Sequence, residues 1–200
     1  MTGKEILRKW EIALLLALCI TLFTGAWASA ASGRVSEQLV RLHVIADSDE
    51  ELEQEIKLDV RDAVLAYLEP RLEGAADSRE AEEIISGSLN GIASAARSAA
   101  RGRSVSVELG DEYYPTRDYG SFSLPAGQYR SLRVTLGEGE GHNWWCVVFP
   151  PLCLTAAETE AAFEELDEGT RAVISEDGTG VVFKFRLLEL WGELREILGI

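Results

Sequence analysis

The chain has few of the residues and motifs on which recognised catalytic sites depend. Its 200 residues include only two histidines, three cysteines and one methionine. It contains no P-loop, no nucleophile elbow, no H-E-x-x-H helix and no paired C-x-x-C. These absences exclude the motif-defined nucleotide hydrolases, serine hydrolases and zinc peptidases. The sequence also lacks internal repeats, long linkers and low-complexity tracts, so one folded domain accounts for most of it.

Basic residues are scarce relative to acidic ones. The chain carries 19 Lys and Arg against 34 Asp and Glu, which gives a formal net charge of −15 at pH 7. Nucleic acids and anionic lipid surfaces are polyanions, so an acidic surface argues against binding to either of them by charge. We therefore expect no nucleic-acid partner. A basic protein partner is compatible with this charge, although solubility alone also accounts for it.

The N-terminal segment has the order of an export signal. Lys4, Arg8 and Lys9 precede an apolar run over residues 12–23, and small residues over 26–30 provide cleavage sites. The apolar stretch up to residue 31 is also long enough to span a bilayer once. Residues 1–31 are therefore predicted to form a signal peptide or a single membrane anchor, and residues 35–200 one exported domain. We expect membrane contact only through this N-terminal segment.

The exported part mixes strand and helix patterns. Alternating apolar residues predict strands over residues 39–46, 104–109, 129–136, 143–149 and 181–186. Repeats of three to four residues predict one helix from the Asp47–Asp49 turn to just before Pro70, and further helices over 78–99, over 155–166 and after 187. The order predicts an α+β domain, in which a mixed or antiparallel sheet packs with several helices, preceded by the signal or anchor helix.

Two connections in this pattern stand out. Gly137, Gly139 and Gly141 predict a hairpin that joins the strands at 129–136 and 143–149. Residues 111–127 are rich in Tyr, Pro and Gly and predict a long surface loop, which is often a functional feature in a compact domain.

Residues 137–153, GEGEGHNWWCVVFPPLC, form the most unusual segment. In a strand, Trp144 and Trp145 point to opposite faces, so one ring can enter the core while the other stands on the surface as a binding anchor. The alternative is that both rings belong to the core. Cys146 and Cys153 can form a disulfide in an exported protein, and the alternative is two buried thiols.

The two histidines provide the candidate for a metal or acid–base centre. His43 and His142 would need carboxylate or thiol partners, and the nearby candidates are Asp47, Asp49, Glu138 and Cys146. Their spacing follows no recognised motif, and a histidine within an apolar strand such as His43 is equally a structural residue. We therefore assign no catalytic residue, metal or cofactor, and we keep an exported metal-assisted hydrolase that uses His43 and His142 as an alternative.

Two passages resemble the stage II sporulation protein R family. They are RLHVIADSDEELEQEIKLDVRDAVLAYL, residues 41–68, and GQYRSLRVTLGEGEGHNWWCVVFPPLC, residues 127–153. With the leader and the FKFRLLELW tail at residues 183–191, the resemblance covers nearly the whole chain. The chain departs from the expected family pattern at Asp47, where we expect Asn.

The resemblance implies an exported sporulation signalling protein that is not itself an enzyme. Members are made in the forespore and exported into the space between the forespore and mother-cell membranes. There they activate a membrane-embedded aspartic-type protease, stage II sporulation protein GA, which cleaves the pro-segment from pro-sigma-E in the mother cell. We expect His142, Asn143, Trp144 and Trp145, together with Arg41 and His43, to include the protease contacts. An exported enzyme and a passive structural domain remain the alternatives.

Overall fold

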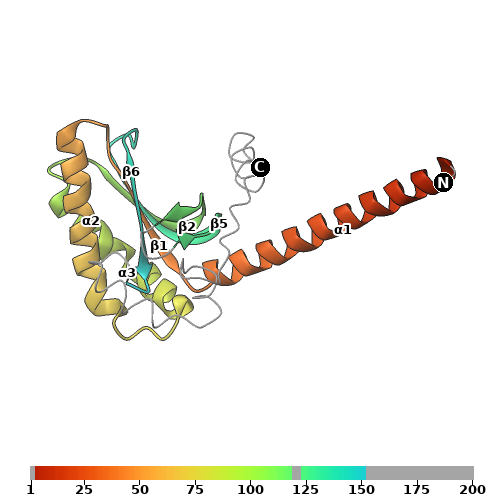
Figure 1. Ribbon diagram of the computed structural model, residues 1–200. Helices are drawn as coiled ribbons and strands as arrows, with labels where there is room; N and C mark the ends of the chain where they lie inside the picture. Colours follow the sequence, from red (N-terminus) through yellow and green to blue (C-terminus); the bar gives the residue numbers. More distant parts are fainter. Residues whose placement is uncertain (1–2, 119–122, 152–200) are drawn as a thin grey trace.

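A computed structural model describes residues 3–118 and 123–151 of the chain (Figure 1). The domain is α+β, as predicted: two helices, α2 (Glu51–Leu72) and α3 (Ser78–Ala99), lie on one face of a mixed four-stranded sheet. The predicted elements at 155–166, at 181–186 and after residue 187 lie outside the described residues.

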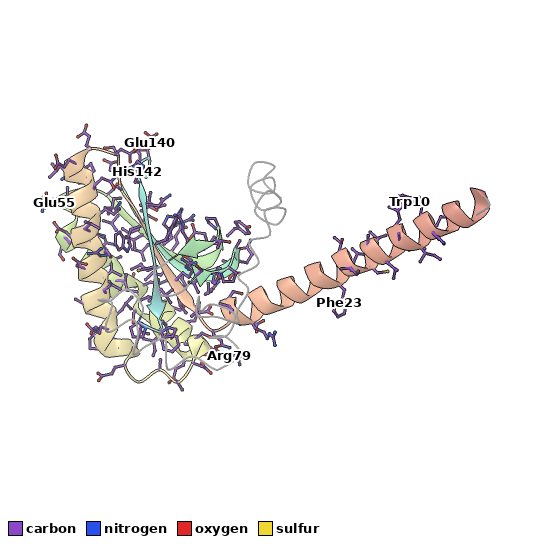
Figure 2. All side chains as sticks on the ribbon, in the orientation of Figure 1. Trp10, Phe23, Glu55, Arg79, Glu140 and His142 are labelled. Carbon is purple, nitrogen blue, oxygen red and sulfur yellow. The ribbon has the colours of Figure 1, made fainter. Side chains whose placement is uncertain are left out.

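The first helix, α1 (Gly3–Ser36), projects away from the domain (Figure 1). Its large apolar side chains from Trp10 to Phe23 are exposed to solvent, and Trp10 and Phe23 themselves are 67% and 76% accessible (Figure 2). The last turn of α1 joins the domain, where Val35 is fully buried. In the part of the chain that the structure describes, no helix meets the length and apolarity required to cross a membrane. Whether residues 1–31 act as a leader or an anchor stays a prediction.

The strands occur in the spatial order β2-β5-β1-β6. β1 (Val40–Ile45) runs parallel to β5 (Gly127–Leu136) and antiparallel to β6 (Asn143–Phe149), while β2 (Val105–Tyr114) runs antiparallel to β5. Two short strands, β3 (Arg117–Asp118) and β4 (Ser123–Leu124), form a separate pair. Four predicted strands are therefore present.

The predicted hairpin between β5 and β6 is wrong. β1 lies between these strands, so that Val44 is opposite Val134 of β5 on one side and Trp144 of β6 on the other. The glycine-rich connection must therefore cross the end of β1. The reason is that its backbone bonds to the segment after β1, as the bond from Gly141 N to Ala46 O at 3.0 Å illustrates.

The predicted loop at 111–127 is wrong at its start. β2 continues to Tyr114, which pairs with Gly127 at the start of β5. Glu112 and Tyr114 look like loop residues in the sequence, but both carry side chains that bond to Ser131 on β5. The sheet therefore gains a polar segment that alternation of apolar residues cannot detect.

The core lies between the sheet and the two helices. α2 contributes the predicted apolar stripe from Ile56 to Leu68, whereas Leu52 at its start is exposed, and α3 contributes a stripe of small and branched residues. The buried members include Ile56, Val60, Val64, Leu68 and Leu72 on α2, Ala81, Ile85, Ile92 and Ala96 on α3, and Val40, Leu42, Val44, Leu132, Val134, Leu136, Cys146 and Val148 on the sheet. Each buried large aliphatic side chain stabilises the fold by about 1.5–3 kcal/mol, so this layer holds the helices against the sheet.

Both predicted ends of the first helix in the domain differ from the structure. α2 runs through Pro70 to Leu72 and does not stop before the proline. The exposed ring of Pro70 faces away from the core, while Leu68 and Leu72 are buried and hold the last turn in place. At the other end, Glu50 is the N-cap and provides no side-chain hydrogen bond. The Asp47 and Asp49 side chains instead accept hydrogen bonds from the backbone of the glycine-rich segment.

Candidate functional site

Two loops distant in the sequence form one surface at the end of β1 and the start of β6. We call residues 46–50 and 137–142 together the double loop. Glu138 N and His142 N donate to Asp47 Oδ1 and Asp49 Oδ1, both at 2.7 Å. Glu140 N also donates to the carbonyl oxygen of Asp47, at 3.1 Å. The two acidic side chains therefore hold the glycine-rich segment and do not cap α2.

The close approach of the two loops requires glycine at two positions. Gly137 has a positive φ of 56°, and a Cβ on it would lie 2.0 Å from Asp47 Oδ1. A Cβ on Gly141 would lie 2.3 Å from the carbonyl oxygen of Ser48. Real Cβ atoms do not come so close to other atoms, so side chains here would force the loops apart.

Lys57 of α2 connects the double loop to the helix through hydrogen bonds. Its Nζ donates to the carbonyl oxygen of His142 at 3.0 Å and to Gln54 Oε1 at 2.6 Å, and Gln54 donates in turn to the carbonyl oxygen of Ser48. Burial lowers the pKa of Lys57, the nearby Asp49 acts in the opposite direction, and Arg61 lowers the pKa further. A buried lysine thus ties both loops to α2.

The double loop presents two of the predicted contact residues to solvent. The His142 side chain is 76% exposed and its Nδ1 contacts Asp49 Oδ1 (Figure 2). Asn143, the first residue of β6, is exposed as well. The backbone of residues 137–142 is held by hydrogen bonds to residues 46–50 and to Lys57, so the positions from which His142 and Asn143 project are fixed.

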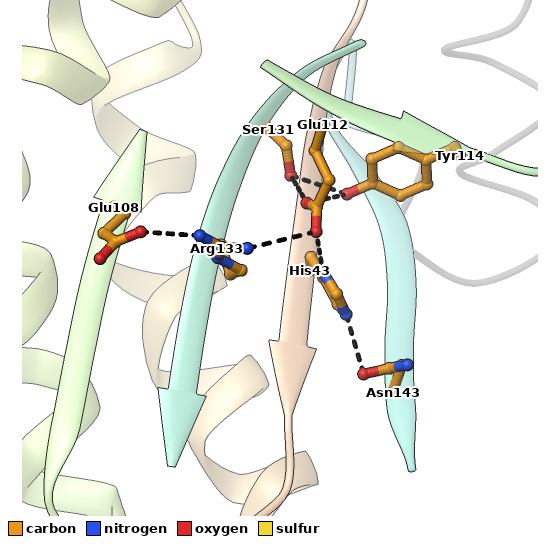
Figure 3. A network of polar contacts seen from close by, with 7 residues as sticks. All are labelled: His43, Glu108, Glu112, Tyr114, Ser131, Arg133 and Asn143. Carbon is orange, nitrogen blue, oxygen red and sulfur yellow. Dashed lines mark hydrogen bonds and ion pairs between the residues drawn. The ribbon is translucent and has the colours of Figure 1, made fainter. Parts of the chain in front are cut away.

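A polar network covers the sheet face opposite the helices and reaches all four strands (Figure 3). Its members are Glu108, Glu112 and Tyr114 on β2, Ser131 and Arg133 on β5, His43 on β1, and Asn143 on β6. His43 is 6% exposed and lies at the centre of the connections between β2 and β6. Its Nδ1 lies 2.8 Å from Glu112 Oε1, and its Nε2 lies 2.9 Å from Asn143 Oδ1.

Glu112 is the charged centre of this network. Burial alone would raise the pKa of its carboxyl group, but the hydrogen bond and charge of His43, the Ser131 hydroxyl and the Arg133 guanidinium together hold it below the ordinary value of 4.5. Ser131 donates to Glu112 Oε2 at 2.9 Å, and Tyr114 OH lies 2.7 Å from Ser131 Oγ. Burial raises the pKa of the Tyr114 hydroxyl, so it is protonated and can donate. The network therefore holds an ionised carboxylate beside a histidine.

Arg41, the first predicted contact residue, is fully buried on this same face. Its guanidinium carbon lies 4.0 Å from the ring centroid of Tyr114 and 5.0 Å from that of Tyr129. These distances are typical of cation–π contacts, so Arg41 supports the aromatic residues beneath the network.

The two tryptophans point to opposite faces of β6, as predicted, and both are half-buried. Trp144 packs against the core beside α2, where the guanidinium carbon of Arg61 lies 4.4 Å from its ring centroid. Trp145 lies on the network face, 5.5 Å from the His43 ring and 3.7 Å from the guanidinium carbon of Arg117. Neither ring is a free-standing surface anchor.

The structure does not bring all the residues of the predicted metal centre together. His142, Asp47, Asp49 and Glu138 belong to the double loop, whereas His43 lies on the network face. Cys146 is opposite Leu42 in the register and faces the core. Among residues 3–118 and 123–151, no three His, Cys, Asp or Glu side chains are grouped so that they could hold a metal ion. Cys153 lies outside the described residues, so its bridge to Cys146 stays a prediction.

Comparison with known proteins identifies the family. Residues 36–159 match the family described as Stage II sporulation protein R. The chain belongs to the stage II sporulation protein R family. Stage II sporulation protein R of Bacillus subtilis (strain 168) is 35% identical over 139 residues, which cover 67% of this chain and 62% of that relative. The chain therefore spans less than two-thirds of the length of this relative. No solved structure matches the chain.

The matched region begins at the end of α1 and contains every strand of the sheet. Within it, the passages that carry the family resemblance meet in the double loop. Sequence reasoning missed several members of the site, among them Lys57, Glu112 and Ser131. Lys57 interrupts the apolar side of α2 as a buried cation, which was a signal in the sequence. Glu112 and Ser131 gave no local signal, because their partners lie on other strands.

Proposed function

We propose that this chain is an exported sporulation signal that activates a membrane-embedded aspartic-type protease, stage II sporulation protein GA, and so triggers processing of pro-sigma-E in the mother cell. The observation that carries this proposal is the double loop. Two passages that share family resemblance, although about ninety residues apart along the chain, are joined by direct hydrogen bonds with His142 and Asn143 exposed beside them.

A rigid surface of this kind suits an activator. An activator shifts its receptor only if it binds the active state more tightly than the inactive one. Binding is stronger when the contact residues are held in place beforehand, because less conformational freedom is lost on association. The loop-to-loop hydrogen bonds and the Lys57 contacts supply such an arrangement for His142 and Asn143. We infer that these two residues, with the half-buried Trp145 beside them, contact the protease.

The network chemistry also favours a binding role over catalysis. Both ring nitrogens of His43 already have partners, a carboxylate and an amide. A general base must reach the proton of a nucleophile or of a bound water, and the Ser131 hydroxyl in this network bonds to Glu112 and Tyr114 instead. The exported metal-assisted hydrolase would require His43 and His142 to act together, and in the structure they contact different residues.

Export is part of the proposal. The domain would act outside the forespore cytoplasm, in the space between the two membranes, with residues 1–31 as its leader or anchor. The acidic charge of the chain, −15 at pH 7, is compatible with a basic surface on the receptor.

Alanine variants test the contact residues. His142→Ala in a system that contains the exported chain, the protease and pro-sigma-E should reduce the rate of processing at least about tenfold, which corresponds to about 1.4 kcal/mol of lost binding. Asn90→Ala is the matched control, since Asn90 is exposed on α3 and away from the double loop. Unchanged processing with a folded, exported His142→Ala and Asn143→Ala double variant would contradict the assignment. Loss of activity only when His43 and His142 are both changed, together with bound metal, would favour the hydrolase.

A further inference from the structure

The side chain of the exposed residue Asn143 forms a hydrogen bond with the buried ring of His43. One end of the side-chain amide, Oδ1, lies 2.9 Å from the buried Nε2 of His43 (Figure 3), and Asn143 is an exposed residue. An amide has a donor end and an acceptor end. Whichever end bonds to the ring, the opposite end is offered to a binding partner.

The charge state of His43 determines which end that is. Glu112 Oε1, 2.8 Å from Nδ1, accepts a hydrogen bond from the N–H of this nitrogen in either state of the ring. When the ring is protonated, Nε2 also donates, so Asn143 must present Oδ1 inward and its NH₂ group outward. When the ring is neutral, Nε2 has a lone pair only, so the NH₂ group must turn inward and Oδ1 outward.

We propose that His43 is a specificity-determining residue of the receptor-binding surface, because its protonation reverses the Asn143 amide and changes the exposed group from an acceptor to a donor. The importance of this reversal for the receptor rests on the proposed function. The reversal itself is a property of the chain alone.

Charged groups of both signs surround the ring. Glu112 on β2 lies 2.8 Å from His43 Nδ1, and its own partner Arg133 on β5 lies 3.8 Å from the same carboxylate oxygen. Cations and titratable rings on the remaining elements complete the surroundings: Arg41 on β1, Tyr114 on β2, and Arg117 of β3 stacked on Trp145 of β6. Among the residues that the structure describes, the side-chain amide of Asn143 is thus the neutral group that bonds to a ring nitrogen of His43, and it can adapt by simple rotation.

Other groups on this face cannot take over the role of the amide. The hydroxyl of Tyr114 bonds to Ser131 and Glu112, and the Trp145 ring packs against the imidazole at 5.5 Å. When Nε2 gains or loses a proton, the side-chain amide of Asn143 must therefore rotate to keep its hydrogen bond with the ring. Asn143 is an exposed residue.

Nitrogen NMR on the purified full-length chain tests this inference without the receptor. The sequence has two histidines, at 43 and 142, and two asparagines, at 90 and 143, so selective ¹⁵N labelling gives two rings and two side-chain amides. As the pH is varied, the Asn143 amide signals should change together with the His43 Nε2 signal, while those of Asn90 stay constant. When the ring is neutral, a through-hydrogen-bond coupling should join Asn143 Nδ2 to His43 Nε2.

Two variants separate the proposed cause from its alternatives. His142→Gln removes the other imidazole, and the Asn143 change should persist in it. Asn143→Asp offers only acceptors, so its side chain cannot donate to the neutral ring and the through-hydrogen-bond coupling should be absent. A His43 ring that titrates while Asn143 stays constant, or an Asn143 change that disappears in His142→Gln, would overturn the inference. Failure of the chain to activate the protease would leave these signals unchanged, so the two proposals fail separately.

Discussion

Gly141→Ala should separate the two halves of the double loop. The added methyl carbon would lie 2.3 Å from the carbonyl oxygen of Ser48, 2.6 Å from its carbonyl carbon and 2.8 Å from Ala46 Cβ. Two of these three atoms are backbone, so no side-chain rotation can relieve the clash. The hydrogen bond from Gly141 N to Ala46 O, now 3.0 Å long, must then lengthen.

The expected loss of stability combines two terms. Overpacking of this kind destabilises proteins by about 1–3 kcal/mol. A weakened backbone hydrogen bond adds about 1 kcal/mol. For a protein of this length, each kcal/mol lowers the melting temperature by about 2–4 °C. Urea unfolding, followed by tryptophan fluorescence, measures the free energy, because Trp144 and Trp145 adjoin the loop.

Gly87→Ala is the matched control. Gly87 lies within α3, and a Cβ on it meets no atom within 4 Å. Alanine is the better helix former, so this variant should be more stable than the wild type by about 0.5–1 kcal/mol. If Gly141→Ala unfolds at the same urea concentration as the wild type, the close contact between the loops is not rigid and our description of the double loop is wrong.

Three further predictions concern the network and the cysteines. Glu112 has a lowered pKa, so its contribution to stability is present above pH 4.5 and is lost as the pH falls through the folded-state value. Acid titration of the unfolding free energy should therefore fall less steeply in Glu112→Gln than in the wild type, and parallel curves would contradict this role. Tyr114→Phe removes a hydroxyl that bonds within the network and should destabilise the chain by about 1 kcal/mol in urea, whereas Tyr67→Phe on α2 should have no effect; equal effects would be the contrary result. Thiol titration of the denatured full-length chain without reductant should detect one of its three cysteines if Cys146 and Cys153 are bridged, and three reactive thiols would exclude the bridge.

Much of the fold follows from local patterns in the sequence. The apolar stripe of α2 and the alternation in β1 predicted these elements to within a few residues, because burial on one face is a short-range signal. The order of strands could not be predicted in this way. The glycine segment looks like a hairpin turn, yet its hydrogen-bond partners are at residues 46 and 47, in a loop far away in the sequence.

The site was predicted only in part, for a similar reason. His142 and Asn143 were identified from the unusual composition of their segment. The partners of His43 lie 69 and 100 positions away, on β2 and β6, and only the folded sheet brings them together. Asp47 and Asp49 looked like helix caps because Asp is common there. Their use as acceptors for a second loop depends on how β1 and β6 are aligned.

The most direct test of the account is reconstitution of processing in a host that does not form spores. The chain, the membrane-embedded protease and pro-sigma-E would be produced together, with export of the chain either intact or blocked. We predict cleavage of pro-sigma-E only when the chain is exported and folded. Absence of cleavage with all three proteins present, folded and correctly located would contradict the proposed activation.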